Sequence, residues 1–232
     1  MADPNIELLT RVAEALGELR QQMAFVGGCA TGLLLTDAAA APVRVTHDVD
    51  AIVAIVSLRE YHRLGAALRS KGFSQTLAGG EPPYRWTFTG MKLDVMPTDP
   101  AILGFSNRWY ERALRTAVVT NITENVTIRL VRPDYFIATK LDAFLDRGQA
   151  DYLLSHDLED VLSVVDGRPE LVGEIAQAEP ALRAYVASVI ARLLDDEGFL
   201  NALPGLVMEA IAAPRTPIVL RRLRALAQLA GP

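Results

Sequence analysis

The sequence predicts an α+β protein, because strand and helix patterns alternate up to about residue 132 and only helical patterns follow. Hydrophobic residues make up 50% of the 232 residues and charged residues 22%, a composition typical of a chain with a sizeable packed core. We therefore predict that strands and helices alternate over residues 1–132 and that residues 133–232 form a helical region.

Apolar and β-branched runs define the strands of the first part, and a 3.6-residue periodicity defines the helices. Ser57 is the expected N-cap of one helix, and Glu60 completes its capping box. The expected strands are 23–26, 48–56, 84–89, 92–96, 116–122 and 126–131. The expected helices are 5–19, 29–36, 57–70, 134–147, 157–166, 170–178, 180–195 and 216–229, with a break from Pro204 to Pro217.

Composition and charge exclude several classes of protein. The net charge of −5 argues against a protein that coats nucleic acid, which needs a basic excess. No uncharged apolar stretch reaches the roughly 18 residues of a membrane span, and the N-terminus lacks the regions of a signal peptide. The single cysteine, Cys29, excludes an internal disulfide and fits a reducing cytoplasm. We expect a cytoplasmic protein with no membrane partner.

Two aspartates open the strand predicted over residues 48–56. Alternation along a strand puts Asp48 and Asp50 on the same face, where their carboxylates repel each other. A divalent cation that prefers hard oxygen ligands, Mg²⁺ or Mn²⁺, relieves that repulsion. A solvated pair at a strand end is the alternative. Asp94, inside the strand 92–96, would add the third carboxylate of a two-metal site, unless it faces water at a strand edge.

A glycine pair follows the first predicted strand. Glycine lets the backbone approach a phosphate closely, so Gly27 and Gly28 are candidate phosphate-binding residues. Taken alone, such a pair usually marks only a tight bend. Its value lies in its position, one helix and one loop ahead of Asp48.

These motifs together resemble the nucleotidyltransferases of the DNA polymerase β superfamily. Phe25-Val-Gly27-Gly28 is similar to their Gly-Gly/Ser motif, and Arg44-Val-Thr46-His-Asp48-Val-Asp50 is similar to the form in the AbiEii/AbiGii toxin branch. The resemblance continues with a lysine motif at Ala138-Thr-Lys140-Leu and an Asp-x-x-Asp motif at Asp157-Leu-Glu-Asp160, and it spans roughly residues 23 to 166. Gly28 stands where many members have serine, so a hydroxyl contact to phosphate is missing.

The resemblance implies a polymerase β-like core, which is a mixed sheet with helices, and a role for each motif residue. Asp48, Asp50 and Asp94 would be catalytic metal ligands, and Gly27 and Gly28 would bend around the phosphates of an NTP. Lys140, contributed by the helical region, would reach the triphosphate; the alternative is an ordinary surface lysine. Asp157 and Asp160 lie on one helical face and would belong to the nucleotide-binding site by orienting Lys140 or the active-site edge; the alternative is that they merely cap a helix.

The expected activity is Mg²⁺- or Mn²⁺-dependent transfer of a nucleoside monophosphate from an NTP to an acceptor hydroxyl. The acceptor would be an RNA 3′ end or a protein, and the toxin-like motif suggests a toxin–antitoxin or phage-defence role with a cognate antitoxin. Three alternatives stay open: an aminoglycoside-type enzyme acting on a small molecule, an inactive nucleotide-binding module, and a phosphohydrolase. An arginine cluster at 215, 221, 222 and 224 could touch nucleic acid or be a solvated face.

Overall fold

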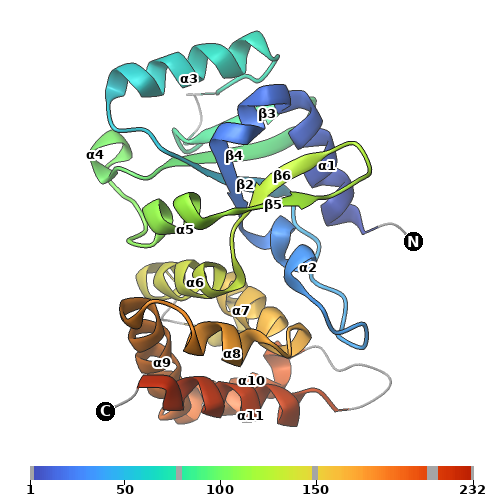
Figure 1. The fold of residues 1–232 in the computed structure, drawn as a ribbon, viewed down its shortest axis with the longest axis vertical. Coiled ribbons are helices and arrows are strands. Elements are labelled where there is room, and N and C mark those ends of the chain that lie inside the picture. The colour runs from blue at the N-terminus through green and yellow to red at the C-terminus, as the bar shows by residue number, and fades with distance from the viewer. Residues whose placement is uncertain (1–2, 77–79, 148–150, 208–213, 231–232) are drawn as a thin grey trace. The chain divides into compact units, whose positions relative to one another are not determined.

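The protein divides into two compact units. The computed structural model describes residues 3–76, 80–147, 151–207 and 214–230 (Figure 1). Unit 1 comprises residues 1–33 and 44–132, and unit 2 comprises residues 34–43 and 133–232. The sequence-based division kept residues 1–132 together, whereas the contacts place 34–43 with the helical unit.

Unit 1 is built on a six-stranded sheet with the strand order β3-β4-β2-β1-β6-β5. The pairs β1–β2, β3–β4 and β5–β6 are antiparallel, and the pairs β2–β4 and β1–β6 are parallel. The predicted mixed sheet is thereby confirmed. The strands are β1 (Met23–Val26), β2 (Asp48–Val53), β3 (Arg85–Phe88), β4 (Met91–Pro97), β5 (Val118–Asn121) and β6 (Thr127–Leu130).

The helices of unit 1 begin where side chains satisfy their first backbone N–H groups. The Asp3 carboxylate accepts from Asn5 N–H at the start of α1, and the Ser57 hydroxyl accepts from Glu60 N–H at the start of α3. The Glu60 carboxylate accepts from Val56 N–H, one residue earlier than a capping box predicts. The helices are α1 (Pro4–Leu16), α2 (Thr31–Leu34), α3 (Leu58–Ser70), α4 (Pro100–Leu103) and α5 (Tyr110–Thr116). The sequence pattern did not predict α4 or α5 as helices.

Unit 2 is helical, as predicted. The predicted break at Pro204 is wrong, because α10 continues to Leu206. The Asp196 side chain caps the start of α10, and Phe199, Leu203 and Leu206 are buried, so capping and packing outweigh one lost hydrogen bond. The helices are α6 (Pro133–Arg147), α7 (His156–Gly167), α8 (Leu171–Ala176), α9 (Pro180–Leu194), α10 (Glu197–Leu206) and α11 (Thr216–Ala227). Among the described residues, none of the helices has the length and apolarity that crossing a membrane requires.

Hydrogen bonds attach segment 34–43 to the end of α7 in unit 2. The amides of Thr36 and Asp37 both donate to the Gly167 carbonyl at 2.9 Å. The Arg168 guanidinium donates to the Leu34 carbonyl at 2.7 Å. A Cβ on Gly167 would lie 2.8 Å from Cδ2 of Leu35, so the segment packs closely only against a glycine. The chain that joins the Gly27-Gly28 turn to Asp48 is therefore held by unit 2 in its middle.

An internal ion pair completes this attachment. The Arg215 guanidinium donates to both oxygens of Asp166, at 2.8 and 3.0 Å, and to Oδ2 of Asp37 at 2.8 Å. The Arg215 side chain is only 5% exposed. Burial raises the pKa of Asp166, whereas the hydrogen bond from Arg215 lowers the pKa of Asp37. Arg215 therefore belongs to the interior and not to a surface patch that could touch nucleic acid.

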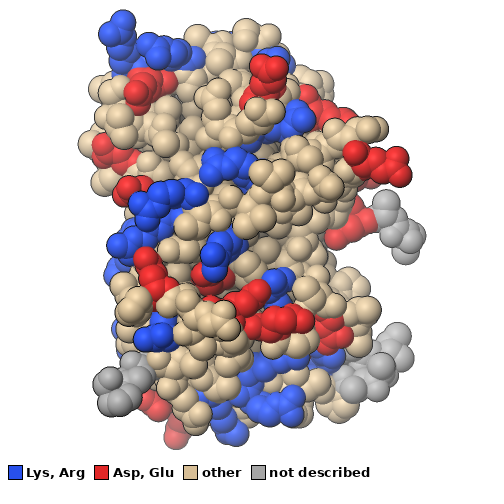
Figure 2. Space-filling model, in the orientation of Figure 1, with Lys and Arg blue, Asp and Glu red and all other residues tan. Residues whose placement is uncertain are grey.

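Charged side chains on the visible face do not form a single basic field. Figure 2 shows lysines and arginines interspersed with aspartates and glutamates on that face. The arginine cluster that the sequence suggested also includes Arg222, whose guanidinium donates to the Val165 carbonyl at 2.9 Å.

Candidate active site

A row of residues in register crosses four strands of unit 1. Val26 of β1 is opposite Asp50 of β2, Asp50 is beside Asp94 of β4, and Asp94 is opposite Arg85 of β3. Residues in register project from the same face of a sheet, and Asp48 shares that face because it lies two positions before Asp50. The sheet therefore brings Asp48, Asp50 and Asp94 to one face from two neighbouring strands.

Arg85 binds two of these aspartates. Its Nε donates to Oδ1 of Asp94 at 2.8 Å, and one terminal nitrogen donates to Oδ2 of Asp94 at 2.7 Å and to Oδ2 of Asp48 at 3.2 Å. Asp94 is only 5% exposed, so this fork neutralises a buried carboxylate. The hydrogen bond to Asp94 raises the pKa of Arg85 above its ordinary value, so Arg85 stays charged. The sequence analysis did not single out Arg85.

The glycine turn is shaped around the carboxylate of Asp50. Gly27 has φ +78° and ψ −176°, a backbone conformation that is essentially restricted to glycine. A Cβ at this position would lie 1.8 Å from Oδ2 of Asp50. The turn and the aspartate pair, separated by about twenty residues in the sequence, are therefore direct neighbours.

Gly28 leaves room for the loop that leads into β2. A Cβ on Gly28 would lie 2.6 Å from a terminal nitrogen of Arg44 and 2.7 Å from Cγ2 of Thr46. A serine here would require both side chains to move. The Arg44 guanidinium therefore occupies the space that a serine side chain at position 28 would need.

Asn5 fixes the same loop from α1. Its side-chain amide donates to the Arg44 carbonyl at 2.8 Å, and its side-chain oxygen accepts from Thr46 N–H at 2.9 Å. Asn5 is 1% exposed, and both ends of its amide are satisfied by backbone groups two residues apart. Asn5 therefore orders the entry to Asp48, a role that no local sequence pattern indicated.

The donor set fits a hard divalent cation, since it consists of carboxylate oxygens on one face of adjacent strands. Within the described ranges of the chain, however, no three Asp, Glu, His or Cys side chains are gathered closely enough to hold a metal ion. The Arg85 guanidinium lies between Asp94 and Asp48 and supplies the positive charge there. The space between Asp94 and Asp48 thus attracts positive charge, and the Arg85 guanidinium occupies it.

Lys140 and the Asp-x-x-Asp motif lie together in unit 2. The Lys140 ammonium group, on α6, is 3.1 Å from Oδ1 of Asp157 and 2.7 Å from Oδ2 of Asp160 on α7. The Lys140 and Asp160 side chains are 12% and 2% exposed, so this is a largely buried cluster and not a surface lysine. Arg147 also donates to Asp157, at 2.9 Å, while Gly148, the next residue in the sequence, lies outside the described residues.

The fold of this chain is similar to that of a solved structure. An antigenic nucleotidyltransferase-like protein from Paracoccidioides brasiliensis is 23% identical, with a TM-score of 0.51 over 87% of this chain and 94% of that chain. The chain has a nucleotidyltransferase-like fold. Two further structures have lower TM-scores. The antibiotic-resistance factor ANT(2'')-Ia is 15% identical (TM-score 0.49, covering 84% of this chain and 97% of that one). JHP933 from Helicobacter pylori is 12% identical (TM-score 0.48, covering 97% and 89%).

No protein-family model matches the chain, and no curated protein matches it significantly. The likeness to the Paracoccidioides brasiliensis structure supports the fold class, and the polymerase β-like α+β arrangement with a helical C-terminal part is confirmed. The assignment to the AbiEii/AbiGii branch stays a prediction.

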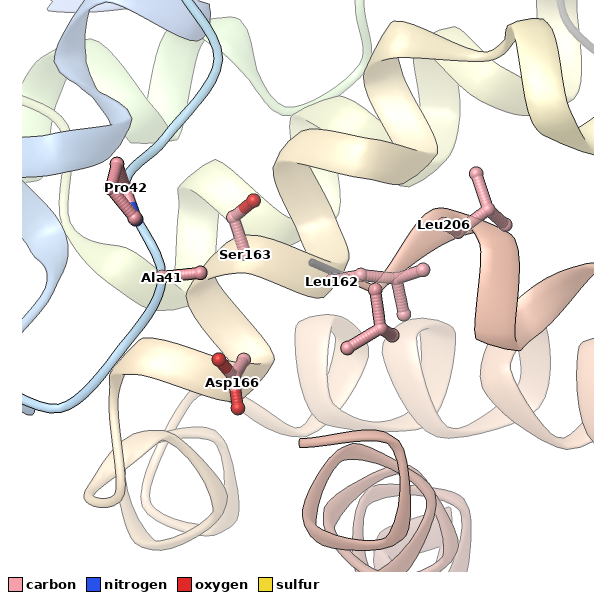
Figure 3. A pocket seen from close by; sticks show the side chains of 7 residues that line it. Ala41, Pro42, Leu162, Ser163, Asp166 and Leu206 are labelled. Carbon is pink, nitrogen blue, oxygen red and sulfur yellow. The ribbon is translucent and has the colours of Figure 1, made fainter. Parts of the chain in front are cut away.

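Two cavities within unit 2 are too small for a nucleoside triphosphate. One, of about 20 Å³, lies beside Asp166 and Ser163 and is closed by Pro42 and Leu206 (Figure 3). The other, of about 250 Å³, lies between Phe144, Tyr152 and Arg192. Ligand sites usually measure about 300–1,000 Å³, so neither cavity is a candidate nucleotide site.

The Asp157 ion pairs predict a pH-dependent contribution to stability. Burial by itself would raise the pKa of Asp157, but the charges of Lys140 and Arg147 outweigh it and lower the pKa below its ordinary 3.8. The ionised carboxylate therefore stabilises the fold above pH 3.8, and this contribution is lost as pH falls through the lower folded-state value. We expect Asp157→Asn to lower the free energy of unfolding at pH 7 by about 2 kcal/mol.

Urea denaturation of the wild type and the variant at several pH values between 7 and 3 measures this difference, which should shrink toward the acid end. Asp195→Asn is the matched control, since Asp195 is an exposed carboxylate in the same unit. A difference that is independent of pH would show that packing, and not the charge of Asp157, causes the effect.

Proposed function

We propose that this protein transfers a nucleoside monophosphate from an NTP to an acceptor hydroxyl and releases pyrophosphate. The observation that carries this proposal is the contact between the glycine turn and the Asp50 carboxylate, where a Cβ on Gly27 would lie 1.8 Å from the carboxylate oxygen. A glycine turn beside carboxylates that attract a cation suits phosphoryl transfer, because the catalysis of that reaction is mainly positioning and charge neutralisation. The nucleotidyltransferase-like fold supports the same conclusion.

The proposed reaction is a direct displacement at phosphorus. The acceptor oxygen forms a bond to the α-phosphorus while the bond from that phosphorus to the oxygen bridging to the β-phosphate breaks. Gly27 and Gly28 would bend around the β- and γ-phosphates, and Asp48 and Asp50 would hold the metal ion. Asp94 would complete the metal site and receive the proton of the acceptor hydroxyl. Mg²⁺ or Mn²⁺, when bound, neutralises and orients the phosphates.

Lys140 is the residue that we propose for contact with the triphosphate. Asp157 and Asp160 support this proposal by holding the ammonium group at 3.1 and 2.7 Å, which fixes the direction of a flexible side chain. The same contacts also suit a purely structural role in pairing α6 with α7. The assignment therefore remains a prediction about unit 2.

The proposed acceptor is a hydroxyl group of RNA or protein. The pattern Arg44-x-Thr46-x-Asp48-x-Asp50 supports these two classes, because it resembles that of the toxin branch. A toxin or phage-defence role and a cognate antitoxin are further predictions from the same resemblance. A small-molecule acceptor of the aminoglycoside type is the alternative within the same chemistry.

The test is incubation of the full chain with each α-labelled NTP, Mg²⁺ and a mixture of total RNA and protein. We expect label to enter one of the two acceptor classes, with pyrophosphate released in equal amount. Asp48→Ala and Asp50→Ala should each reduce transfer to background, because the cation and phosphates lose their ligands. Glu111→Ala, which removes an exposed carboxylate of α5 in the same unit, should leave transfer unchanged.

Three results would contradict the proposal in different ways. Full transfer by both Asp48→Ala and Asp50→Ala would show that these aspartates do not form the catalytic site. Release of inorganic phosphate without label transfer would favour a phosphohydrolase. NTP binding without release of either product would favour a nucleotide-binding module that acts through a partner.

A further inference from the structure

Arg85 interacts with three carboxylates at the acidic end of the sheet. It forks onto both oxygens of Asp94 at 2.8 and 2.7 Å, reaches Oδ2 of Asp48 at 3.2 Å, and lies 3.5 Å from Glu81. The Asp94 side chain is 7% exposed and that of Arg85 is 20% exposed, so water screens this pair poorly. The guanidinium is therefore a strongly held counter-charge.

A divalent cation at this place would need the same oxygens. Mg²⁺ binds carboxylate oxygens at about 2.0–2.1 Å in a strict octahedral arrangement. Two guanidinium nitrogens of Arg85 already donate to the two Asp94 oxygens, and one of these nitrogens also donates to Asp48. Two positive groups cannot share these oxygens without strong repulsion, so binding of one weakens binding of the other.

We propose that Arg85 is an internal counter-cation that competes with the divalent cation for Asp94 and Asp48. In the absence of metal, Arg85 neutralises the buried carboxylate and keeps the strands β3, β4 and β2 together. When a cation binds, the guanidinium gives up at least one of its two aspartates. This inference rests on the proposed function, because it takes the aspartates to be metal ligands.

The competition lowers the apparent affinity of the protein for metal. Only the fraction of molecules in which the Arg85 guanidinium has released at least one of Asp94 and Asp48 can bind the cation. The freed guanidinium, still on β3 beside Asp94, becomes available to a phosphate group, whose oxygens its planar fork of N–H donors can bind in pairs. Arg85 is thus a positioning residue that acts through Asp94 and Asp48.

The experiment measures Mn²⁺ binding to the full chain by electron paramagnetic resonance, without nucleotide. We expect Arg85→Gln to bind Mn²⁺ at least about tenfold more tightly than the wild type, because the competing charge is gone. Arg85→Lys keeps the charge but cannot fork onto both oxygens, so it should fall between the two. The matched control is Arg63→Gln, which removes an exposed arginine of α3 in the same unit and should change the affinity less than about twofold.

Thermal unfolding provides a second readout for variants of lowered stability. Arg85→Gln should melt below the wild type without metal, and Mn²⁺ should raise its melting temperature more than that of the wild type. If Arg85→Gln binds Mn²⁺ no more tightly than the wild type, while Asp94→Asn abolishes binding, Arg85 does not compete with the cation. The proposed metal site would then still be supported. Mn²⁺ binding that none of Asp48→Ala, Asp50→Ala and Asp94→Asn affects would instead overturn the proposed metal site, and the inference with it.

Discussion

Replacing Gly27 with alanine should abolish nucleotidyl transfer and lower the free energy of unfolding by about 3 kcal/mol. Two causes combine. The backbone at φ +78° and ψ −176° is strained for any residue with a side chain, and the new methyl group would lie 1.8 Å from Oδ2 of Asp50. The turn or the aspartate must shift, and either shift separates the two halves of the proposed site. Urea denaturation and the labelled-NTP assay measure the two effects.

Two comparisons separate these causes. Gly104→Ala is the matched control, because Gly104 has φ +80° but its Cβ would meet nothing within 4 Å, so we expect a loss of only about 1 kcal/mol. The double variant Gly27→Ala with Asp50→Ala removes the atoms that collide. If the double variant is no more stable than Gly27→Ala alone, the close approach to Asp50 is not what requires a glycine.

Replacing Arg215 with methionine should lower the free energy of unfolding by about 3–5 kcal/mol. The substitution leaves Asp166, which is 4% exposed, buried without its main partner. It also removes the ion pair at 2.8 Å that ties Asp37 to α11. We therefore expect faster amide hydrogen exchange at Thr36 and Asp37, whose N–H groups bond to Gly167.

Denaturation and hydrogen exchange together test this prediction. Arg224→Met is the matched control, since Arg224 is an exposed residue of the same helix, and it should change the stability by less than about 0.5 kcal/mol. Loss of stability with unchanged exchange in segment 34–43 would show that Arg215 stabilises the helices without anchoring the segment.

Local sequence patterns were sufficient for the type and position of most elements. The strand 23–26 was predicted with its observed bounds, because a short apolar run followed by two glycines can continue neither as a helix nor as a longer strand. The helix after Ser57 was predicted from its cap. The α10 helix was missed because proline was read as a break, whereas its burial and its cap at Asp196 decide the outcome.

The placement of Arg85 could in part have been predicted. Thr89 and Gly90 both have positive φ, as a two-residue hairpin turn requires, and such a turn places residue 88 opposite 91 and residue 85 opposite 94. Counting back from Gly90 therefore pairs Arg85 with Asp94. No count along the hairpin reveals that the guanidinium also reaches Asp48, because that contact crosses from β3 over β4 to β2.

The sequence by itself determined the α+β class, the strands and helices before residue 132 and the candidate residues Asp48, Asp50, Asp94, Gly27 and Gly28, because strand alternation and turn chemistry are local properties of the chain. Only the tertiary structure decided what these residues contact. The order of strands, which depends on packing between distant segments, puts Asp50 between the glycine turn and Asp94. The strand order also brings Arg85 to Asp94. The ion pair between Arg215 and Asp37 links segment 34–43 to the helical unit, and such contacts between distant residues form only in the folded core.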